Sequence, residues 1–293
     1  MSTNPEAPWT IARLIAWTRQ YFERAGLDAP RLCAEILLAH ALGCERIELY
    51  TRHETVPPAD VLARYRELVR QAAQGRPIAY LTGTKEFFSL SFKVTEAVLI
   101  PRPETEVLVE RVIHLARHSD QAIARICDVG TGSGCIAIAL AHNLPELVIC
   151  ASDISPAALA VARENAERLA VGGRIEFREG DLLEPWRDQP PFDLIASNPP
   201  YISEAELPGL PANVRDHEPR AALLAGPDGL AVHRRLIAQA PDYLRPGGHL
   251  LLEVAFDQAP AVVRLLDESG WRDIVTYRDT LQHERVVHAR RPG

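Results

Sequence analysis

The chain has 293 residues, of which 24% are charged and 47% hydrophobic, and its formal net charge is -7 at pH 7. These are ordinary globular values, which exclude intrinsic disorder, and a chain of this length can bury about three quarters of its unfolded surface. The acidic balance argues against a protein that holds nucleic acid by general neutralisation of phosphates. We therefore expect a small-molecule or protein partner and no direct binding of nucleic acid.

The cysteines and the apolar runs indicate a cellular location. Five cysteines form no C-x-x-C pair, and three of them, Cys127, Cys135 and Cys150, lie in or beside predicted core elements. They are interpreted as small buried hydrophobic residues rather than disulfides or zinc ligands, which predicts a reducing compartment. Residues 1–9 lack the basic and apolar regions of a leader, and no apolar run approaches membrane-spanning length. We expect a cytoplasmic protein that does not contact membranes.

Three amphipathic helices are predicted over residues 1–76. Apolar residues recur at helical spacing from Ile11 to Phe22, and a second helix, which Asp28 can cap, ends near Gly43. A third helix follows Pro57-Pro58 and ends near Gly75. These stripes predict a small all-α domain with its own core, and the bundle as a whole is a candidate docking surface for the substrate.

A linker over residues 77–98 is predicted to join this bundle to the rest of the chain. The sequence Gly75-Arg76-Pro77 opens the linker, and the stretch from Phe87 to Val94 alternates apolar and polar residues, which predicts a hairpin. A helix is expected from Glu104 to His118.

Strands and helices alternate over residues 99–293. We expect strands near 124–129, 147–152, 174–179, 193–197, 248–256, 272–277 and 284–290, with helices between most of them. This order predicts an α/β domain with a doubly wound, mostly parallel sheet. The last two strands are joined by a short connection, so that one of them can run antiparallel.

A glycine-rich loop follows the first of these strands. The segment Asp128-Val-Gly130-Thr131-Gly132-Ser133-Gly134 leads directly into a helix, and its glycines let the backbone turn sharply and approach a ligand. The dinucleotide fingerprint would need glycine or alanine where Cys135 stands. The spacing G-x-G-x-G after an acidic residue suits an adenosyl ligand without a pyrophosphate.

Two aspartates end the next two strands. Asp153 stands about twenty residues beyond the glycine loop, where a carboxylate can accept both ribose hydroxyl hydrogens. Its alternative role, capping the next helix, suits Ser155 better. Asp181 could accept from an adenine amino group, and a plain turn aspartate is the alternative there. Trp186 could border the same pocket, although an anchor for its Pro-rich loop is the favoured interpretation.

Asn198-Pro199-Pro200-Tyr201 follows the apolar run 192–197, at the carboxyl end of a predicted strand, where open α/β sheets bind their ligands. The two prolines remove N–H groups and stiffen the loop, which leaves bare oxygens. The Asn198 side-chain oxygen and the Pro199 carbonyl can together accept both hydrogens of a planar NH2 group while Tyr201 covers its flat face. Taken alone, the motif is equally compatible with a Pro-rich surface turn.

No metal site is expected. His114 and His118 share a helix face at a spacing of four residues, but no glutamate follows His114 and no third ligand is evident.

Several motifs taken together resemble the HemK family of S-adenosylmethionine-dependent methyltransferases, which modify the glutamine of the Gly-Gly-Gln motif in peptide-chain release factors. The resemblance covers nearly the whole chain. It rests on Gly75-Arg76-Pro77-x-x-Tyr80-x-x-Gly83 with Phe87 and Phe88, Leu99-Ile100-Pro101-Arg102-Pro103-x-Thr105-Glu106, the glycine loop, Asp153, Asn198-Pro-Pro-Tyr201, Glu218-Pro219-x-x-Ala222-Leu223 and Gly226-x-Asp228-Gly229-Leu230.

The resemblance implies a class I S-adenosylmethionine-dependent methyltransferase domain, Rossmann-like, over residues 99–293, preceded by the small all-α domain. It implies that S-adenosylmethionine is the methyl donor and that class I release factors are the partners. The cofactor residues that the resemblance implies are Gly130, Thr131, Gly132, Ser133, Gly134, Asp153 and Asn198. Asp181 is added to them because it could accept from the adenine amino group. The implied substrate residues are Asn198, Pro199, Pro200 and Tyr201, of which Asn198, Pro199 and Tyr201 are the catalytic candidates.

One position departs from the family pattern. Some members carry an aromatic residue just after the third strand, where this chain has Leu182 and Leu183. Which residue between Leu182 and Trp186 lines the adenine pocket therefore stays open. The segment from Glu218 to Leu230 is expected to shape the loop over the site.

Three other functions compete with this interpretation. An adenine-amino methyltransferase acting on DNA or RNA would present the same planar NH2 group, but the acidic balance and the lack of a basic recognition segment disfavour it. A nicotinamide-dependent oxidoreductase is disfavoured by Cys135. A noncatalytic release-factor binding module would leave the Asn-Pro-Pro-Tyr sequence unexplained. We expect a monomer.

Overall fold

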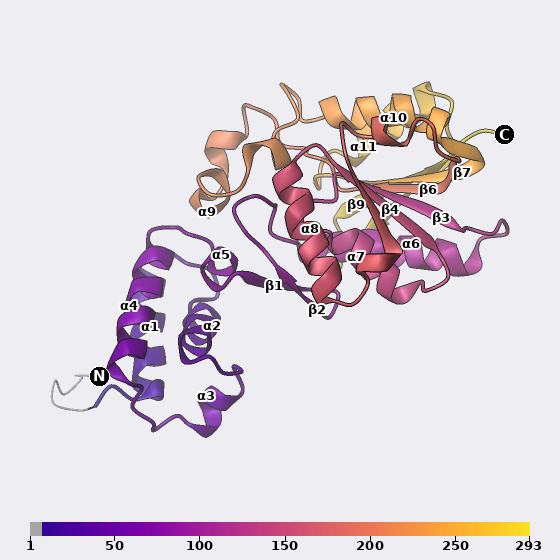
Figure 1. The fold of residues 1–293 in the computed structure, drawn as a ribbon. Coiled ribbons are helices and arrows are strands. Elements are labelled where there is room, and N and C mark those ends of the chain that lie inside the picture. The colour runs from indigo at the N-terminus through magenta and orange to yellow at the C-terminus, as the bar shows by residue number, and fades with distance from the viewer. Residues whose placement is uncertain (1–7) are drawn as a thin grey trace. The chain divides into compact units, whose positions relative to one another are not determined.

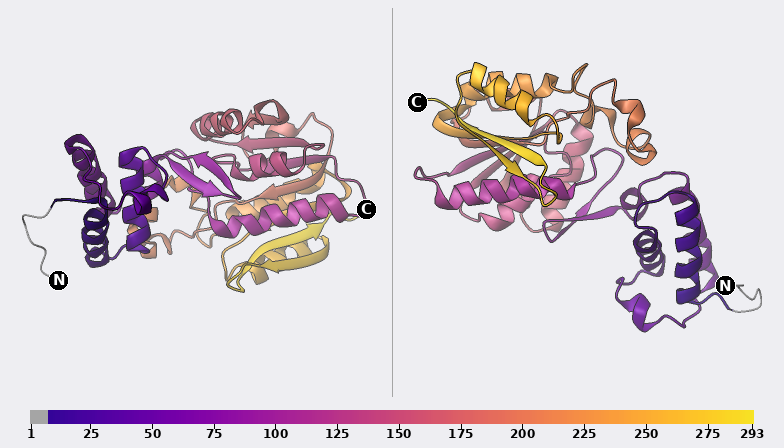
Figure 2. Two further views of the ribbon diagram at one scale, coloured as in Figure 1. Left: turned by 90° about the horizontal axis from the view of Figure 1, so that it is seen from below. Right: turned by 180° about the vertical axis from the view of Figure 1, so that it is seen from behind.

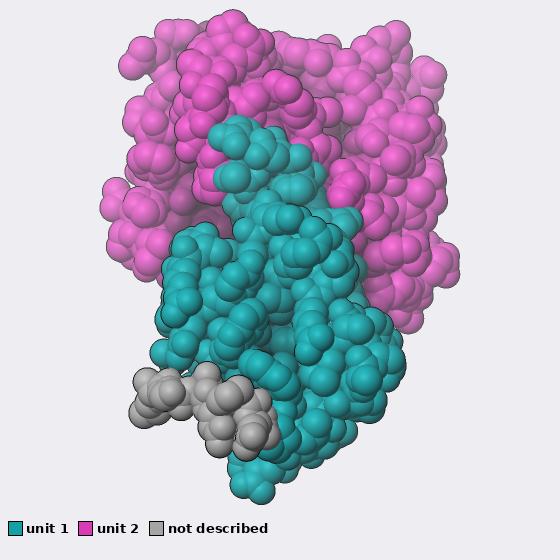
Figure 3. Space-filling view, turned by 90° about the vertical axis from the view of Figure 1, so that its left-hand side faces the viewer, with its two compact units in different colours: residues 1–83, 212–217 teal, residues 84–211, 218–293 magenta. Residues whose placement is uncertain are grey.

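The computed structural model describes residues 8–293. The prediction that residues 1–9 carry no leader falls mostly on residues 1–7, which lie outside the described part. The chain forms two compact units (Figure 3). The first holds residues 1–83 and 212–217, and the second holds residues 84–211 and 218–293. Among the described residues, no helix is long and apolar enough to cross a membrane.

The first unit is helical and has its own core. Its helices are α1 (Ile11–Arg24), α2 (Pro30–Leu42), α3 (Glu48–Thr51), α4 (Ala59–Ala73), α5 (Ile78–Thr82) and α9 (Ala212–Arg215). The stripe predicted on α1 is largely buried, because Ile11, Thr18 and Phe22 are 0% exposed while Tyr21 is 38% exposed. Inside the bundle the Tyr65 hydroxyl donates to Thr18 Oγ1 at 2.9 Å, which satisfies both buried hydroxyls.

One local expectation for this part of the chain is wrong, and two details were not foreseen. Asp28 does not cap α2: the cap position is Ala29, left-handed at φ 46°, and Pro30 opens the helix with no side-chain cap. The predicted linker contains helix α5. The predicted hairpin forms, from β1 (Thr84–Phe87) and β2 (Leu90–Lys93), and Phe88 lies in its turn. Phe88 and Ser89 have φ of 49° and 60°, the conformation of a two-residue hairpin turn.

A seven-stranded sheet dominates the second unit. The strands are β3 (Arg125–Val129), β4 (Val148–Asp153), β5 (Ile175–Glu179), β6 (Phe192–Ser197), β7 (Leu244–Glu253), β8 (Arg272–Arg278) and β9 (Glu284–Arg290). Their spatial order is β5-β4-β3-β6-β7-β9-β8, and β9 pairs antiparallel with both of its neighbours. The predicted strands therefore form, although β7 begins and ends a few residues earlier than expected.

Helices cover both faces of this sheet (Figures 1 and 2). They are α6 (Glu106–His118), α7 (Cys135–Asn143), α8 (Pro156–Arg168), α10 (Ala231–Tyr243) and α11 (Ala259–Glu268), with short 3-10 turns at 103–105, 172–174, 184–186, 207–209 and 220–222. Successive strand residues point to opposite faces. Ile126 and Leu194 pack with α6 and α7, whereas Cys127 and Ile195 pack with α10 and α11. Two apolar layers result.

The strand order reverses beside β3. From the central strand β3 the chain proceeds outward to β4 and β5, and it then returns to place β6 on the other side of β3. The carboxyl ends of β3 and β6 therefore diverge into loops that leave on opposite sides of the sheet. Such a switch point is where open α/β sheets bind ligands.

Candidate active site

A cavity of about 340 Å³ lies at the carboxyl ends of the parallel strands, within the second unit. Its wall includes the loops that follow β3, β4, β5 and β6, together with segments from 97–105 and 219–224. Of the predicted site residues, it is lined by Gly130, Thr131, Gly132, Ser133, Asp153, Asp181, Asn198 and Pro200. Gly134, Pro199 and Tyr201 are not among its lining residues.

The glycine loop is anchored from beneath by Asp128. This aspartate is fully buried, and its Oδ2 accepts from Thr131 Oγ1 at 2.6 Å and from the backbone N–H of Ala137 at 3.2 Å. Burial raises the pKa of Asp128 to about 7. One carboxylate therefore ties the loop to the first turn of α7. The sequence showed this aspartate only as the acidic residue before the glycines.

The glycines serve two different purposes. Gly130 and Gly132 have φ of 74° and 56°, and a Cβ built on either would meet nothing within 4 Å, so the space beside them belongs to the cavity. At Gly134, by contrast, a Cβ would lie 2.9 Å from Ile138 Cδ1 and 3.2 Å from Ala162 Cβ. Gly134 thus lets α7 pack closely against α8, and the first two glycines leave the wall of the cavity bare.

Asp153 connects the end of β4 to the glycine loop. Its Oδ2 accepts from the N–H of Gly132 at 2.8 Å, and its Oδ1 accepts from the N–H of Ser155 at 2.9 Å. Burial raises the pKa of Asp153 above its ordinary value, while the backbone donors hold it down. Ser155 caps α8 by accepting from the N–H of Ala158 at 3.2 Å, as expected.

The segment after β5 contributes a leucine, and not an aromatic ring, to the wall of the cavity. Leu182, at φ 53°, lines the cavity, whereas Leu183 is fully buried in the core. Trp186 is also buried and packs edge-on against Phe192 at 5.8 Å between ring centroids, so it anchors its loop and does not border the cavity. Asp181 does line the cavity, and its Oδ2 forms an ion pair with Arg235 at 2.5 Å.

Asn198 is the first residue after β6. Its side chain is oriented by a contact that cannot be predicted from the sequence. Its Nδ2 donates to Thr105 Oγ1 at 3.1 Å, across 93 positions of the chain. Thr105 is 2% exposed and also lines the cavity. Since the amide nitrogen is engaged by the threonine, the Asn198 Oδ1 is the atom left to accept from a ligand.

The remainder of the Asn-Pro-Pro-Tyr loop is fixed through its backbone. The Tyr201 carbonyl accepts from Gln258 Nε2 at 2.8 Å. Gly229, at φ 72°, lies against the same carbonyl, and a Cβ there would approach the Tyr201 oxygen to 2.4 Å. Burial raises the pKa of the Tyr201 hydroxyl to about 12, so it stays protonated at neutral pH. The segment around Gly229 therefore does shape the loop, as expected.

Two segments of the cavity wall are clamped by one buried carboxylate. Glu218 forms an ion pair with Arg102 and accepts from the N–H of Ile100 at 3.3 Å. Glu218 is 4% exposed, so the pair is shielded on one side from water. The contact holds the segment 97–105 beside the segment 219–224.

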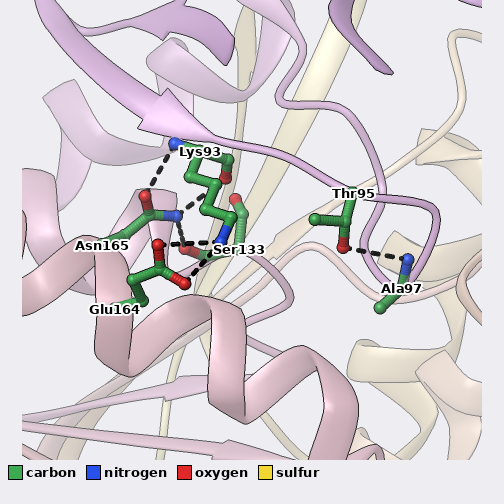
Figure 4. A network of polar contacts seen from close by, with 6 residues as sticks. All are labelled: Lys93, Thr95, Ala97, Ser133, Glu164 and Asn165. Carbon is green, nitrogen blue, oxygen red and sulfur yellow. Dashed lines mark hydrogen bonds and ion pairs between the residues drawn. The ribbon is translucent and has the colours of Figure 1, made fainter. Parts of the chain in front are cut away.

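A further anchor joins the hairpin to the glycine loop (Figure 4). Asn165, fully buried on α8, accepts from the N–H of Lys93 at 2.7 Å and donates to the carbonyls of Lys93 and Ser133, each at 2.9 Å. The neighbouring Glu164 forms an ion pair with Lys93 Nζ at 2.6 Å. One amide side chain therefore supports both β2 and a residue of the cavity wall.

Two histidines on α6 and the five cysteines are the other residues with metal-binding or nucleophilic side chains that the sequence singled out. His114 and His118 stack at 4.5 Å between ring centroids, and no group of three or more His, Cys, Asp or Glu residues that could hold a metal is found among residues 8–293. All five cysteines are free, with Cys127, Cys135 and Cys150 buried.

The chain is similar in sequence to known protein families and to named relatives. The PrmC N-terminal domain family matches residues 13–83, and the methyltransferase small domain family matches residues 105–209. The release factor glutamine methyltransferase of Rhodopirellula baltica is 44% identical over 288 residues, which are 97% of each chain. That of Geobacter sulfurreducens is 44% identical over 290 residues, which are 99% of each chain.

A solved structure shares the fold. The 16S rRNA N2 G1207 methyltransferase of T. thermophilus, determined in complex with AdoMet and guanosine, superposes with a TM-score of 0.51 at 18% identity, covering 71% of this chain and 49% of that chain. The sheet and its covering helices are those of a class I methyltransferase. Within that class, the two relatives named above are each 44% identical over nearly the whole chain. The chain therefore belongs to the release factor glutamine methyltransferase family. The resemblance found in the sequence is thereby confirmed.

Proposed function

We propose that this protein transfers a methyl group from S-adenosylmethionine to the side-chain nitrogen of the glutamine in the Gly-Gly-Gln motif of class I peptide-chain release factors. The observation that carries the proposal is the orientation of Asn198. Its Nδ2 is held by Thr105, so that its Oδ1 is left as an acceptor at a cavity that the glycine loop also lines.

The residues around the cavity fit an adenosyl cofactor. The volume of about 340 Å³ falls within the range of about 300–1,000 Å³ for small-molecule pockets. Gly130 and Gly132 leave their side of the cavity free of side-chain atoms. Asp153 supplies a carboxylate that accepts from the N–H groups of Gly132 and Ser155, and the capacity of its two oxygens beyond these contacts is available to ribose hydroxyls. When bound, S-adenosylmethionine supplies an electrophilic methyl group on a sulfonium sulfur.

The chain's own contribution is to orient a poor nucleophile. An amide nitrogen shares its lone pair with its carbonyl, so it must be presented with its out-of-plane density toward the methyl group. Asn198 Oδ1 and the Pro199 carbonyl would accept its two hydrogens, and the Tyr201 ring would pack against the amide plane. Fixing two reacting groups in this way supplies much of the barrier reduction in a direct displacement. The amide proton becomes acidic as the new bond forms and leaves to water.

We further propose that the first unit docks the release factor. Helix α1 exposes Trp17 and Tyr21, which are 46% and 38% exposed and stack at 5.3 Å between ring centroids. Large aromatic side chains of this kind are enriched in protein interfaces and at their energetic centres. We expect Trp17→Ala to raise the Michaelis constant for the release factor about 10-fold, which is a loss of about 1.4 kcal/mol, while kcat stays unchanged. Arg19→Ala, on the same helix, is the matched control. An unchanged Michaelis constant in Trp17→Ala contradicts this docking surface.

The reaction itself is tested by product mapping. The protein is incubated with S-adenosylmethionine and a purified release factor, and the tryptic peptides are analysed by mass spectrometry. A single added methyl group on the glutamine of Gly-Gly-Gln is expected, and a release factor carrying Gln→Ala at that position should remain unmodified. Methylation elsewhere on the release factor, or methylation of a DNA duplex in its place, would refute the proposal.

A further inference from the structure

In the proposed function, the end of the cavity beside β5 holds the adenine of the cofactor. Along the carboxyl edge of the sheet the loops follow the strand order β3, β4 and β5, so that the glycine loop, Asp153 and Asp181 stand in sequence. An adenosyl ligand whose ribose lies at Asp153 therefore has its base at the end of β5, on the side away from β6 and Asn198. Leu182 lines the cavity there, and no aromatic side chain of the described segment 180–187 does. The flat faces of the base need another partner.

Helix α10 supplies an arginine to this end of the cavity. Val232 and Arg235, three residues apart and thus on one face of the helix, both line the cavity. The Arg235 Nη2 donates to Asp181 Oδ2 at 2.5 Å, across 54 positions of the chain. The side chains of this pair are 47% and 34% exposed, and an ion pair so exposed adds little to the stability of a fold. The contact matters instead for where it holds the guanidinium, which is beside the residue that precedes Leu182.

We propose that Arg235 binds the adenine of S-adenosylmethionine by laying its guanidinium against the face of the base. This inference rests on the proposed function, because it takes S-adenosylmethionine as the cofactor. A guanidinium is planar and weakly hydrated, and it stacks on aromatic faces, whereas the ammonium of a lysine is a compact, strongly hydrated charge. Arg235 thus takes the place of the aromatic ring that some family members carry after the third strand.

The ion pair gives Arg235 and Asp181 different parts of the base. The Asp181 Oδ2 is engaged by Arg235, while Oδ1 takes no part in that contact and can accept from the adenine amino group at the edge of the ring. A guanidinium has no acceptor, so the amino group falls to Asp181 and the face of the base to Arg235. Because the two charges balance, the pair places no net charge against a cofactor whose sulfonium is itself a cation.

The test measures ligand affinity by calorimetry with the full-length protein. The ligands are S-adenosylhomocysteine and methylthioadenosine, which has the adenosyl half without the amino acid. We expect Arg235→Ala to weaken the binding of both about 10-fold. Arg234→Ala is the matched control, because Arg234 lies on the same helix, is 46% exposed and also pairs with an aspartate, Asp228, but does not line the cavity. Unchanged affinity in Arg235→Ala, or a loss for S-adenosylhomocysteine alone, overturns the inference.

A third ligand separates contact with the base from an indirect effect through Asp181. The analogue of methylthioadenosine that lacks the amino group gives Asp181 no hydrogen to accept. If Arg235 stacks on the base, Arg235→Ala should weaken the binding of this analogue about 10-fold as well, because the face of the ring is unchanged. If Arg235 only orients Asp181, the variant and the wild type bind the analogue equally, and that result overturns the inference. A wild-type protein that binds neither S-adenosylhomocysteine nor methylthioadenosine refutes the proposed function instead, so the two failures are distinguishable.

Discussion

The two halves of the cavity rim are built in different ways. On the β3–β4 side, three backbone N–H groups donate to the carboxylates of Asp128 and Asp153 and hold the glycine loop. On the β6–β7 side, the orientation of Asn198 depends on a side-chain contact with Thr105. A backbone N–H has one orientation, whereas a side-chain amide can turn over. The donors of the first half therefore have a fixed orientation, and the second half is sensitive to conservative substitution.

The largest effect is expected at Asn198. Asn198→Ala removes an acceptor for the substrate amide, which should lower kcat by about 10²- to 10³-fold, as the loss of one oriented hydrogen-bonding group does in other active sites. The affinity for S-adenosylmethionine should change little, because in the proposed site the glycine loop and Asp153 would hold most of the ligand. Single-turnover kinetics and calorimetry separate the two quantities. Asn143→Ala, at the far end of α7, is the control. If Asn198→Ala turns over at a rate near that of the wild type, the assigned role is wrong.

A substitution at Asp153 should change the affinity for the cofactor rather than kcat. Asp153→Ala removes the proposed partner of the ribose hydroxyls and two contacts within the rim, which should weaken cofactor binding about 10- to 100-fold. At saturating cofactor the kcat should stay within a few-fold of wild type, in contrast to Asn198→Ala. Asp267→Ala on α11 is the matched exposed substitution. Unchanged affinity in calorimetry would remove Asp153 from the ribose site.

The sequence predicts the parts of the site that follow from local pattern. The apolar runs located the strands, and the glycine spacing and the Asn-Pro-Pro-Tyr sequence stand where strands end, so their convergence follows from the parallel topology. Position-specific backbone conformation was harder to predict. Ala29 and Phe88 adopt positive φ without being glycine, which no propensity indicates, and the cap expected at Asp28 is absent.

What remained hidden is the set of long-range supports. Thr105 contacts Asn198 across 93 positions, and Asn165 contacts Lys93 across 72. A buried asparagine in a helix carries no local signature, because its partners are chosen by tertiary packing. For Thr105, the resemblance to the family did mark the motif, but it gave the residue no role.

The smallest effects should distinguish two neighbouring residues on α8. Asn165→Ala leaves the N–H of Lys93 and the carbonyl of Ser133 without their amide partner, which should lower the free energy of unfolding by about 1–3 kcal/mol. Glu164→Ala removes an ion pair whose side chains are 37% and 47% exposed, which should cost at most about 1 kcal/mol. Urea unfolding of both variants measures this contrast.

The same pair tests whether the β3–β4 half of the rim needs its outer support. Because Asn165 holds Ser133 and Glu164 does not, only Asn165→Ala should also weaken S-adenosylmethionine binding, by a few-fold, in calorimetry at neutral pH. If the two variants lose equal stability and neither changes the affinity, the glycine loop is held by Asp128 and Asp153 alone. The contrast between the two halves would then be sharper still, since the backbone contacts would need no long-range support at all.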